Sequence, residues 1–180
     1  LTYADGSSET VSTNTDWLVT LDGPIISNSV YYGETFDARR TELSWQNAAE
    51  VDAPQGKLEM QKFSPMKRIN EFRPLTVEKR DNESFIITAP EMVTGWAKIR
   101  INEPKNKEIT IRYNEYLSDD GQVVKIGKGE GRDGNWWPQN YIQHDTFISN
   151  GEECFFEPKF SYKGFRYIQI DNVQDDFSAD

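Results

Sequence analysis

Hydrophobic and polar residues alternate with a period of two along most of this chain, and sustained helical periodicity is almost absent. The alternation is clearest in the middle of the sequence, at Ile99 and Ile101 and again at Ile109, Ile111 and Tyr113. Because successive side chains of a strand point to opposite faces, these residues are expected to line one buried face.

The same pattern predicts further short strands, and Gly, Asp, Asn and Pro separate them at the spacing of turns. These segments are 1–3, 9–12, 16–20, 25–32, 75–77, 85–87, 145–149, 155–156, 159–162 and 165–170. Only Thr41 to Val51 could hold a helical turn or two. We therefore predict an all-β protein with little helix, built as an antiparallel β-sandwich.

A linker-like run, Asp52-Ala53-Pro54-Gln55-Gly56, divides the pattern. It predicts two regions, residues 1–56 and residues 57–180, of which the second carries the sharper strand signals.

Composition narrows the classes of partner. The 180 residues contain 30 acidic and 20 basic side chains, for a net charge of −10, with 13% aromatic residues and a mean hydropathy of −0.74. Disordered chains are poor in aromatic residues, and a membrane-spanning helix needs a long apolar run that this sequence lacks. An acidic surface is repelled by phosphate backbones and anionic bilayers, so neither nucleic acid nor membrane is expected as a partner.

Catalytic and metal-binding motifs are not recognisable. One cysteine, Cys154, and one histidine, His144, exclude an internal disulfide and paired-ligand metal motifs, and no cofactor is expected. Asp145 follows His144 directly, but neighbours on a strand point to opposite faces, so the pair is badly placed for general base catalysis. The sequence indicates no compartment, and a secreted or periplasmic location stays open.

A glycine-rich segment between Val124 and Gln143 does not fit the sheet pattern. Its aromatic residues Trp136, Trp137 and Tyr141, with Asn135 and Asn140 beside them, have the chemistry of a sugar-stacking platform. The alternative, which we favour, is that this loop folds back on its own sandwich or packs against a neighbouring domain.

A second candidate is the charge cluster formed by Glu34, Asp37 and Arg39. Two carboxylates could carry out glycosidic acid and base chemistry across a cleft. An arginine–carboxylate network that braces the domain junction is the interpretation that we favour, because nothing beside the cluster resembles a substrate cleft.

Several segments resemble, in order, the accessory β-domains of bacterial α-L-rhamnosidases. They are Gly33-Glu34-Thr35-Phe36-Asp37-Ala38-Arg39, Thr94-Gly95-Trp96-Ala97-Lys98-Ile99-Arg100-Ile101, Ile111-Arg112-Tyr113-Asn114-Glu115-Tyr116-Leu117, Asp145-Thr146-Phe147-Ile148 and the run from Phe156 to Ile168. One departure is the segment Ile86 to Met92, where the family often has an Asp-Phe-Gly-Gln-Asn-like run. No single segment is specific for the family, but all of them together, in the family's order, are.

The resemblance implies a jelly-roll or concanavalin-like sandwich, with residues 1–56 as the last strands of a preceding β-sandwich. It also implies a parent enzyme that hydrolyses terminal α-L-rhamnosides with inversion in a C-terminal α/α barrel. The catalytic motifs of that barrel have no counterpart here, so we expect a non-catalytic accessory region whose partner is the barrel of the same chain. The alternative is an independent carbohydrate-binding module that binds rhamnose-containing glycans through the aromatic loop, by which we mean Trp136, Trp137 and Tyr141 with their neighbours.

Overall fold

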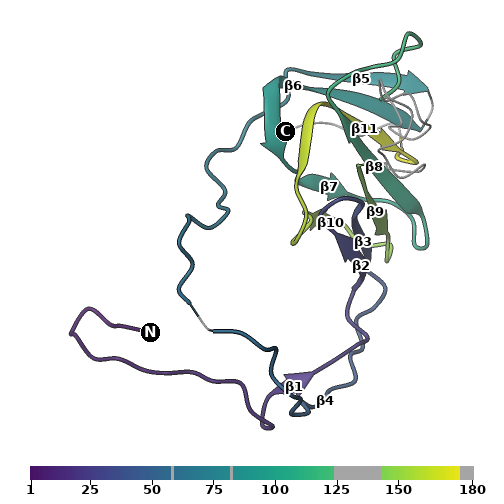
Figure 1. Ribbon diagram of the computed structural model, residues 1–180. Helices are drawn as coiled ribbons and strands as arrows, with labels where there is room; N and C mark the ends of the chain where they lie inside the picture. Colours follow the sequence, from purple (N-terminus) through teal and green to yellow (C-terminus); the bar gives the residue numbers. More distant parts are fainter. Residues whose placement is uncertain (58, 82, 124–142, 175–180) are drawn as a thin grey trace. The chain divides into compact units, whose positions relative to one another are not determined.

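The computed structural model describes residues 1–57, 59–81, 83–123 and 143–174 (Figure 1). The chain folds as two separate units. The smaller unit contains residues 1–23 and 42–68, and the larger contains residues 24–41 and 69–180.

All regular elements of the described residues are strands. In chain order they are β1 Leu18–Val19, β2 Ile25–Ser29, β3 Gly33–Asp37, β4 Gln46–Asn47, β5 Thr76–Asp81, β6 Ser84–Gly95, β7 Ile99–Ile101, β8 Glu108–Asn114, β9 His144–Ile148, β10 Cys154–Phe156 and β11 Lys163–Asp171. None of these residues forms a helix that is long and apolar enough to cross a membrane.

A seven-stranded sheet dominates the larger unit, in the order β2-β3-β9-β8-β11-β6-β5. Its pairs are antiparallel except β3 and β9, which run parallel with Thr35 opposite Thr146 and Phe36 opposite Phe147. Strands β7 and β10 form a separate antiparallel pair. Phe156 of β10 packs its ring 5.3 Å from that of Phe147 on β9, which joins the two sheets through the core.

The core of this unit has the residues that the alternation predicted. Ile109 and Ile111 of β8 are fully buried, Tyr113 is 2% exposed, and Ile99 and Ile101 of β7 are buried as well. Polar residues between them reach the other face or the surface, as the two-residue repeat requires. The result is an all-β, sandwich-type fold, as expected from the sequence.

The two units do not divide the chain at a single point. Residues 24–41 belong to the larger unit, because β2 and β3 extend its main sheet through β9. The smaller unit is held by one short pair, β1 with β4, and by a bridge between Thr2 and Ser8. Residues 41–51 contain β4 and no helical turn, and residues 159–162 form no strand.

Candidate functional site

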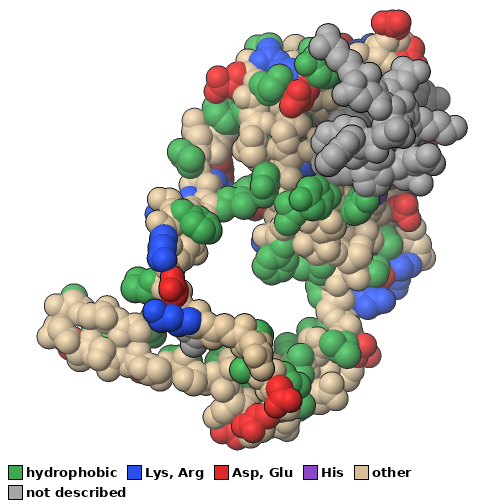
Figure 2. All heavy atoms as spheres, viewed as in Figure 1, with side chains coloured by type: hydrophobic (Ala, Val, Ile, Leu, Met, Phe, Trp, Pro, Cys, Tyr) green, Lys and Arg blue, Asp and Glu red, His purple; other side chains and the backbone are tan. Residues whose placement is uncertain are grey.

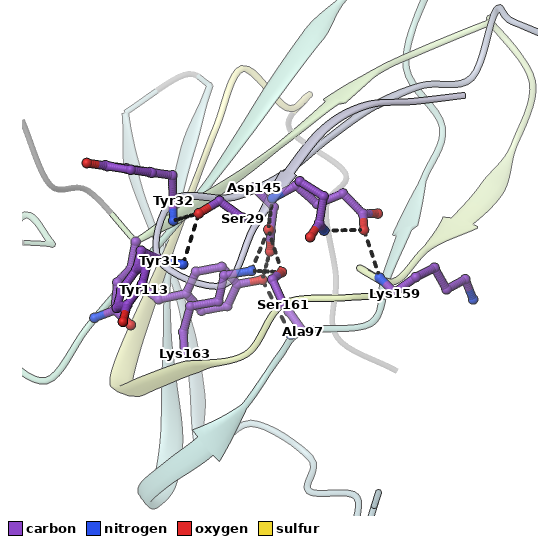
Figure 3. Close-up of polar contacts among 12 residues, drawn as sticks. Ser29, Tyr31, Tyr32, Ala97, Tyr113, Asp145, Lys159, Ser161 and Lys163 are labelled. Carbon is purple, nitrogen blue, oxygen red and sulfur yellow. Dashed lines mark hydrogen bonds and ion pairs between the residues drawn. The ribbon is translucent and has the colours of Figure 1, made fainter. Parts of the chain in front are cut away.

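A group of charged and polar side chains is buried where β3, β9, β8 and β11 meet (Figure 3). Glu34 comes from β3, Asp145 from β9, Tyr113 from β8 and Lys163 from the start of β11. None of these four residues is more than 2% exposed. We call them, together with Ser161, the buried network.

Asp145 is the hub of the buried network. Its Oδ1 accepts the backbone N–H of Glu34 at 2.9 Å and forms an ion pair with Lys163 Nζ, while its Oδ2 accepts the hydroxyl of Tyr113 at 2.9 Å. Lys163 Nζ also donates to Ser161 Oγ at 2.7 Å. Buried charge is tolerated only when it is paired and hydrogen-bonded, and Asp145 meets both conditions.

Glu34 ties two surface segments to this hub. Its Oε2 accepts the side-chain amide of Asn28 at 3.1 Å and the backbone N–H of Lys159 at 3.0 Å. Its Oε1 is buried and accepts no hydrogen bond. The carboxylate therefore joins the β2–β3 hairpin to the segment that leads into β11.

Burial and charge act in opposite directions on the lysine. Burial lowers the pKa of Lys163, while the carboxylates of Asp145 and Glu34 oppose that shift. The pKa of the Tyr113 hydroxyl lies well above its ordinary value, first because of burial and then because of the neighbouring Asp145 charge. The ammonium also lies 5.0 Å from the centre of the Tyr113 ring, a favourable cation–π distance.

Glycine at position 33 permits this close approach. Gly33 has a φ of 88°, and a Cβ built there would lie 1.7 Å from the carbonyl oxygen of His144. No side chain fits at that distance, and L-residues rarely adopt that φ. Glycine therefore lets the β2–β3 hairpin close onto the start of β9.

The arrangement is suited to holding structure together. A glycosidase needs two carboxyl groups that face a sugar and, in inverting enzymes, a water between them. Asp145 and Glu34 are 0% and 1% exposed, and donors from the protein itself occupy Asp145 and Oε2 of Glu34. Neither carboxylate is open to a substrate in this conformation.

The structure brings together two of the three residues in the predicted charge cluster. Arg39 Nε and Nη2 donate to the two oxygens of Asp37 at 2.7 and 2.8 Å, and Arg39 Nη1 donates to Asn106 Oδ1 at 2.7 Å. The hydrogen bond from Arg39 lowers the pKa of Asp37. Glu34 belongs to the buried network instead, because residues three apart on a strand point to opposite faces.

The predicted sugar-stacking platform lies outside the described residues. Its members are Asn135, Trp136, Trp137, Asn140 and Tyr141.

Sequence reasoning missed the roles of Asp145 and Lys163, for which one signal was available. In the run from Ser161 to Phe165, Lys163 stands at an alternating position that a buried strand would turn inward.

Comparison with known proteins identifies both parts of the chain. The α-L-rhamnosidase N-terminal domain matches residues 1–71, and the bacterial α-L-rhamnosidase concanavalin-like domain matches residues 78–180. An α-L-rhamnosidase of Formosa agariphila is 29% identical over the whole chain, and one of Streptomyces avermitilis is 24% identical over 93% of it. The chain spans only 19% and 16% of these two relatives.

Solved structures of α-L-rhamnosidases resemble the chain in fold as well. The α-L-rhamnosidase from Dictyoglumus thermophilum superposes with a TM-score of 0.78 and 28% identity, over 99% of this chain and 20% of that one. The α-L-rhamnosidase from Aspergillus terreus gives a TM-score of 0.76 and 26% identity, over 99% of this chain and 21% of that one. These matches confirm the resemblance read from the sequence motifs, and the chain belongs to the α-L-rhamnosidase family, of which it represents the N-terminal domain region.

Proposed function

We propose that this region is a non-catalytic accessory part of an α-L-rhamnosidase, and that it packs against and positions a catalytic α/α barrel in the same polypeptide. The parent enzyme would hydrolyse terminal α-L-rhamnosides. The observation that carries the proposal is the joint match of two non-barrel domains over nearly the whole chain, while the chain spans only 19% and 16% of relatives named α-L-rhamnosidase.

The chemistry of the buried network supports a structural role. The Asp145 carboxylate and Oε2 of Glu34 accept hydrogen bonds from internal donors, and both side chains are shielded from water, whereas glycoside hydrolysis requires carboxyl groups that reach the glycosidic oxygen. Asp37 is likewise paired with Arg39 in a bidentate arrangement. These groups brace the sandwich rather than attack a sugar.

The test is to compare the parent enzyme with a version that lacks residues 1–180. The barrel alone should melt at a lower temperature and lose activity faster on heating, because the accessory region no longer covers its surface. Adding the purified 180-residue chain in trans should restore part of the stability. A barrel that keeps the same melting temperature and half-life without this region would contradict the positioning role.

The alternative is a carbohydrate-binding module that uses the aromatic loop. It is favoured by the run Asn135-Trp136-Trp137, whose flat rings suit the C–H face of a sugar. Titrating L-rhamnose into the chain and into the double variant Trp136→Ala, Trp137→Ala would decide between the two. Binding heat that the double variant loses would support the module, and no heat in either protein would exclude it.

A further inference from the structure

Four exposed aromatic residues lie on the two surface segments that the buried network joins. They are Tyr31, Tyr32, Phe160 and Tyr162, which are 67%, 45%, 68% and 36% exposed. We call these four residues the aromatic rim. Figure 2 shows further hydrophobic side chains at the surface near β7 and β10, the pair that precedes Phe160 in the chain.

The two segments of the aromatic rim are held close to each other. Glu34 lies two residues after Tyr32, and it accepts the backbone N–H of Lys159, the residue before Phe160. Ser161, between Phe160 and Tyr162, turns inward and is 5% exposed. The internal hydrogen bonds therefore bring the hairpin and the segment before β11 to the same part of the surface.

The β2–β3 hairpin is also fixed in conformation. Ser29 Oγ accepts the backbone N–H groups of Tyr31 and Tyr32 at 3.2 and 3.3 Å (Figure 3), and Gly33 lies against the carbonyl of His144. Aromatic side chains on a fixed backbone lose little entropy when a partner covers them. Exposed tyrosines and phenylalanines of this kind are typical anchors of protein interfaces.

We propose that the aromatic rim is the surface on which this region docks against the catalytic part of the parent chain. The inference rests on the proposed function and assigns it a location. In the α-L-rhamnosidases of Formosa agariphila and Streptomyces avermitilis, more than four fifths of the polypeptide lies outside the matched part. That remaining chain supplies an intramolecular partner, present at high effective concentration.

Two other occupants fit less well. A second copy of the chain would bring together two molecules that each carry a net charge of −10, which opposes association. For a sugar, the tyrosine hydroxyls of the rim would have to supply most of the hydrogen bonds, because the Asn28 amide already donates to Glu34 and Ser29 Oγ already accepts two backbone N–H groups. A protein surface that covers the rings needs fewer hydrogen bonds from the rim.

Site-specific photo-crosslinking in the parent enzyme tests the location directly. A benzoylphenylalanine is placed at Phe160 or Tyr31, and a control at Leu75, which is 63% exposed and precedes β5 at the opposite edge of the sheet. Crosslinks from positions 160 and 31 to peptides of the catalytic part, without such crosslinks from position 75, are expected. Crosslinks between two copies, or to the catalytic part from position 75 alone, would overturn the proposal.

Association in trans separates this proposal from the one on which it rests. The double variant Tyr31→Ala, Phe160→Ala should bind the separately produced barrel at least about tenfold more weakly, whereas Leu75→Ala should bind like the original chain. If the original chain binds and the double variant binds equally well, the rim is the wrong surface and the accessory role stands. If the original chain does not bind the barrel at all, both the docking surface and the accessory role are contradicted. Tyrosine fluorescence that L-rhamnose changes in the original chain and not in the double variant would assign the rim to a glycan instead.

Discussion

Lys163 and Asp145 form an ion pair whose side chains are 1% and 0% exposed. Each also bonds a hydroxyl group, Lys163 that of Ser161 and Asp145 that of Tyr113, and these hydrogen bonds offset part of the desolvation cost. The pair links the start of β9 to the start of β11, two strands that are separated in the sheet by β8.

Replacing the lysine should therefore be costly. Lys163→Met leaves the carboxylate of Asp145 buried without its counter-ion, which is expected to lower the free energy of unfolding by about 3–5 kcal/mol in urea titrations. Adding Asp145→Asn should recover part of that loss because no charge remains unpaired. The control is Arg100→Met, whose partner Glu153 is 3.9 Å away and more than half exposed. Equal losses in Lys163→Met and Arg100→Met would contradict the role of the buried pair.

Gly33 should tolerate no side chain. Gly33→Ala combines an unfavourable φ of 88° with a collision of its Cβ against the carbonyl oxygen of His144. Gly151→Ala is the matched control, since its φ is 89° but the nearest atom lies 3.2 Å away, on the Lys105 side chain. We expect a loss of about 1 kcal/mol for Gly151→Ala and clearly more for Gly33→Ala in urea titrations. Similar losses would mean that the contact with His144 matters little.

Asp37 and Arg39 should contribute a pH-dependent part of the stability. An aspartate in an unfolded chain has a pKa of about 3.9, and Arg39 holds the pKa of folded Asp37 below its ordinary value. The contribution is therefore present above the unfolded pKa and is lost as the pH falls through the folded one.

The variant Arg39→Met removes this contribution. Because Arg39 is partly exposed, we expect the variant to be modestly less stable than the original at pH 7, with a difference that shrinks below about pH 4. Glu153→Gln, which alters an exposed ion pair, should show no such trend. A difference between original and Arg39→Met protein that stays constant from pH 7 to strongly acidic pH would contradict the assignment.

The larger unit should need its β2–β3 hairpin. A chain that begins at Lys57 lacks both strands, which leaves β9 without its parallel partner and removes Glu34 from the buried network. We expect residues 57–180 to show no cooperative thermal unfolding by circular dichroism, whereas residues 24–180 should unfold cooperatively. Cooperative unfolding of both chains at the same temperature would contradict this expectation and support a domain boundary near Gly56.

The sequence was informative where structure is local. Alternation predicted the buried face of β8 correctly, because Ile109, Ile111 and Tyr113 obey the two-residue repeat of any strand. It could not predict that β3 pairs with β9. Phe36 and Phe147 lie far apart in the chain, and the residues of a strand do not by themselves indicate which distant strand it pairs with. The match of the N-terminal domain ends at residue 71, so this parallel pairing also joins the segments that the two family matches assign to different domains.

The candidate site was less predictable for the same reason. Glu34 and Asp37 looked like one cluster because they are close in sequence, but a strand sends them to opposite faces. Two partners of Glu34, namely Asp145 and Lys159, come from segments more than 100 residues away. These residues come together only because the order of strands in the sheet places β3 beside β9 and near β11.

The central claim, that this region supports a rhamnosidase without performing the hydrolysis, is tested most directly with 4-nitrophenyl α-L-rhamnopyranoside. The purified 180-residue chain should release nitrophenol no faster than buffer, under conditions in which the parent enzyme turns the substrate over. Hydrolysis by the isolated chain that Glu34→Gln abolishes, while the variant keeps the folded circular dichroism spectrum, would contradict the claim.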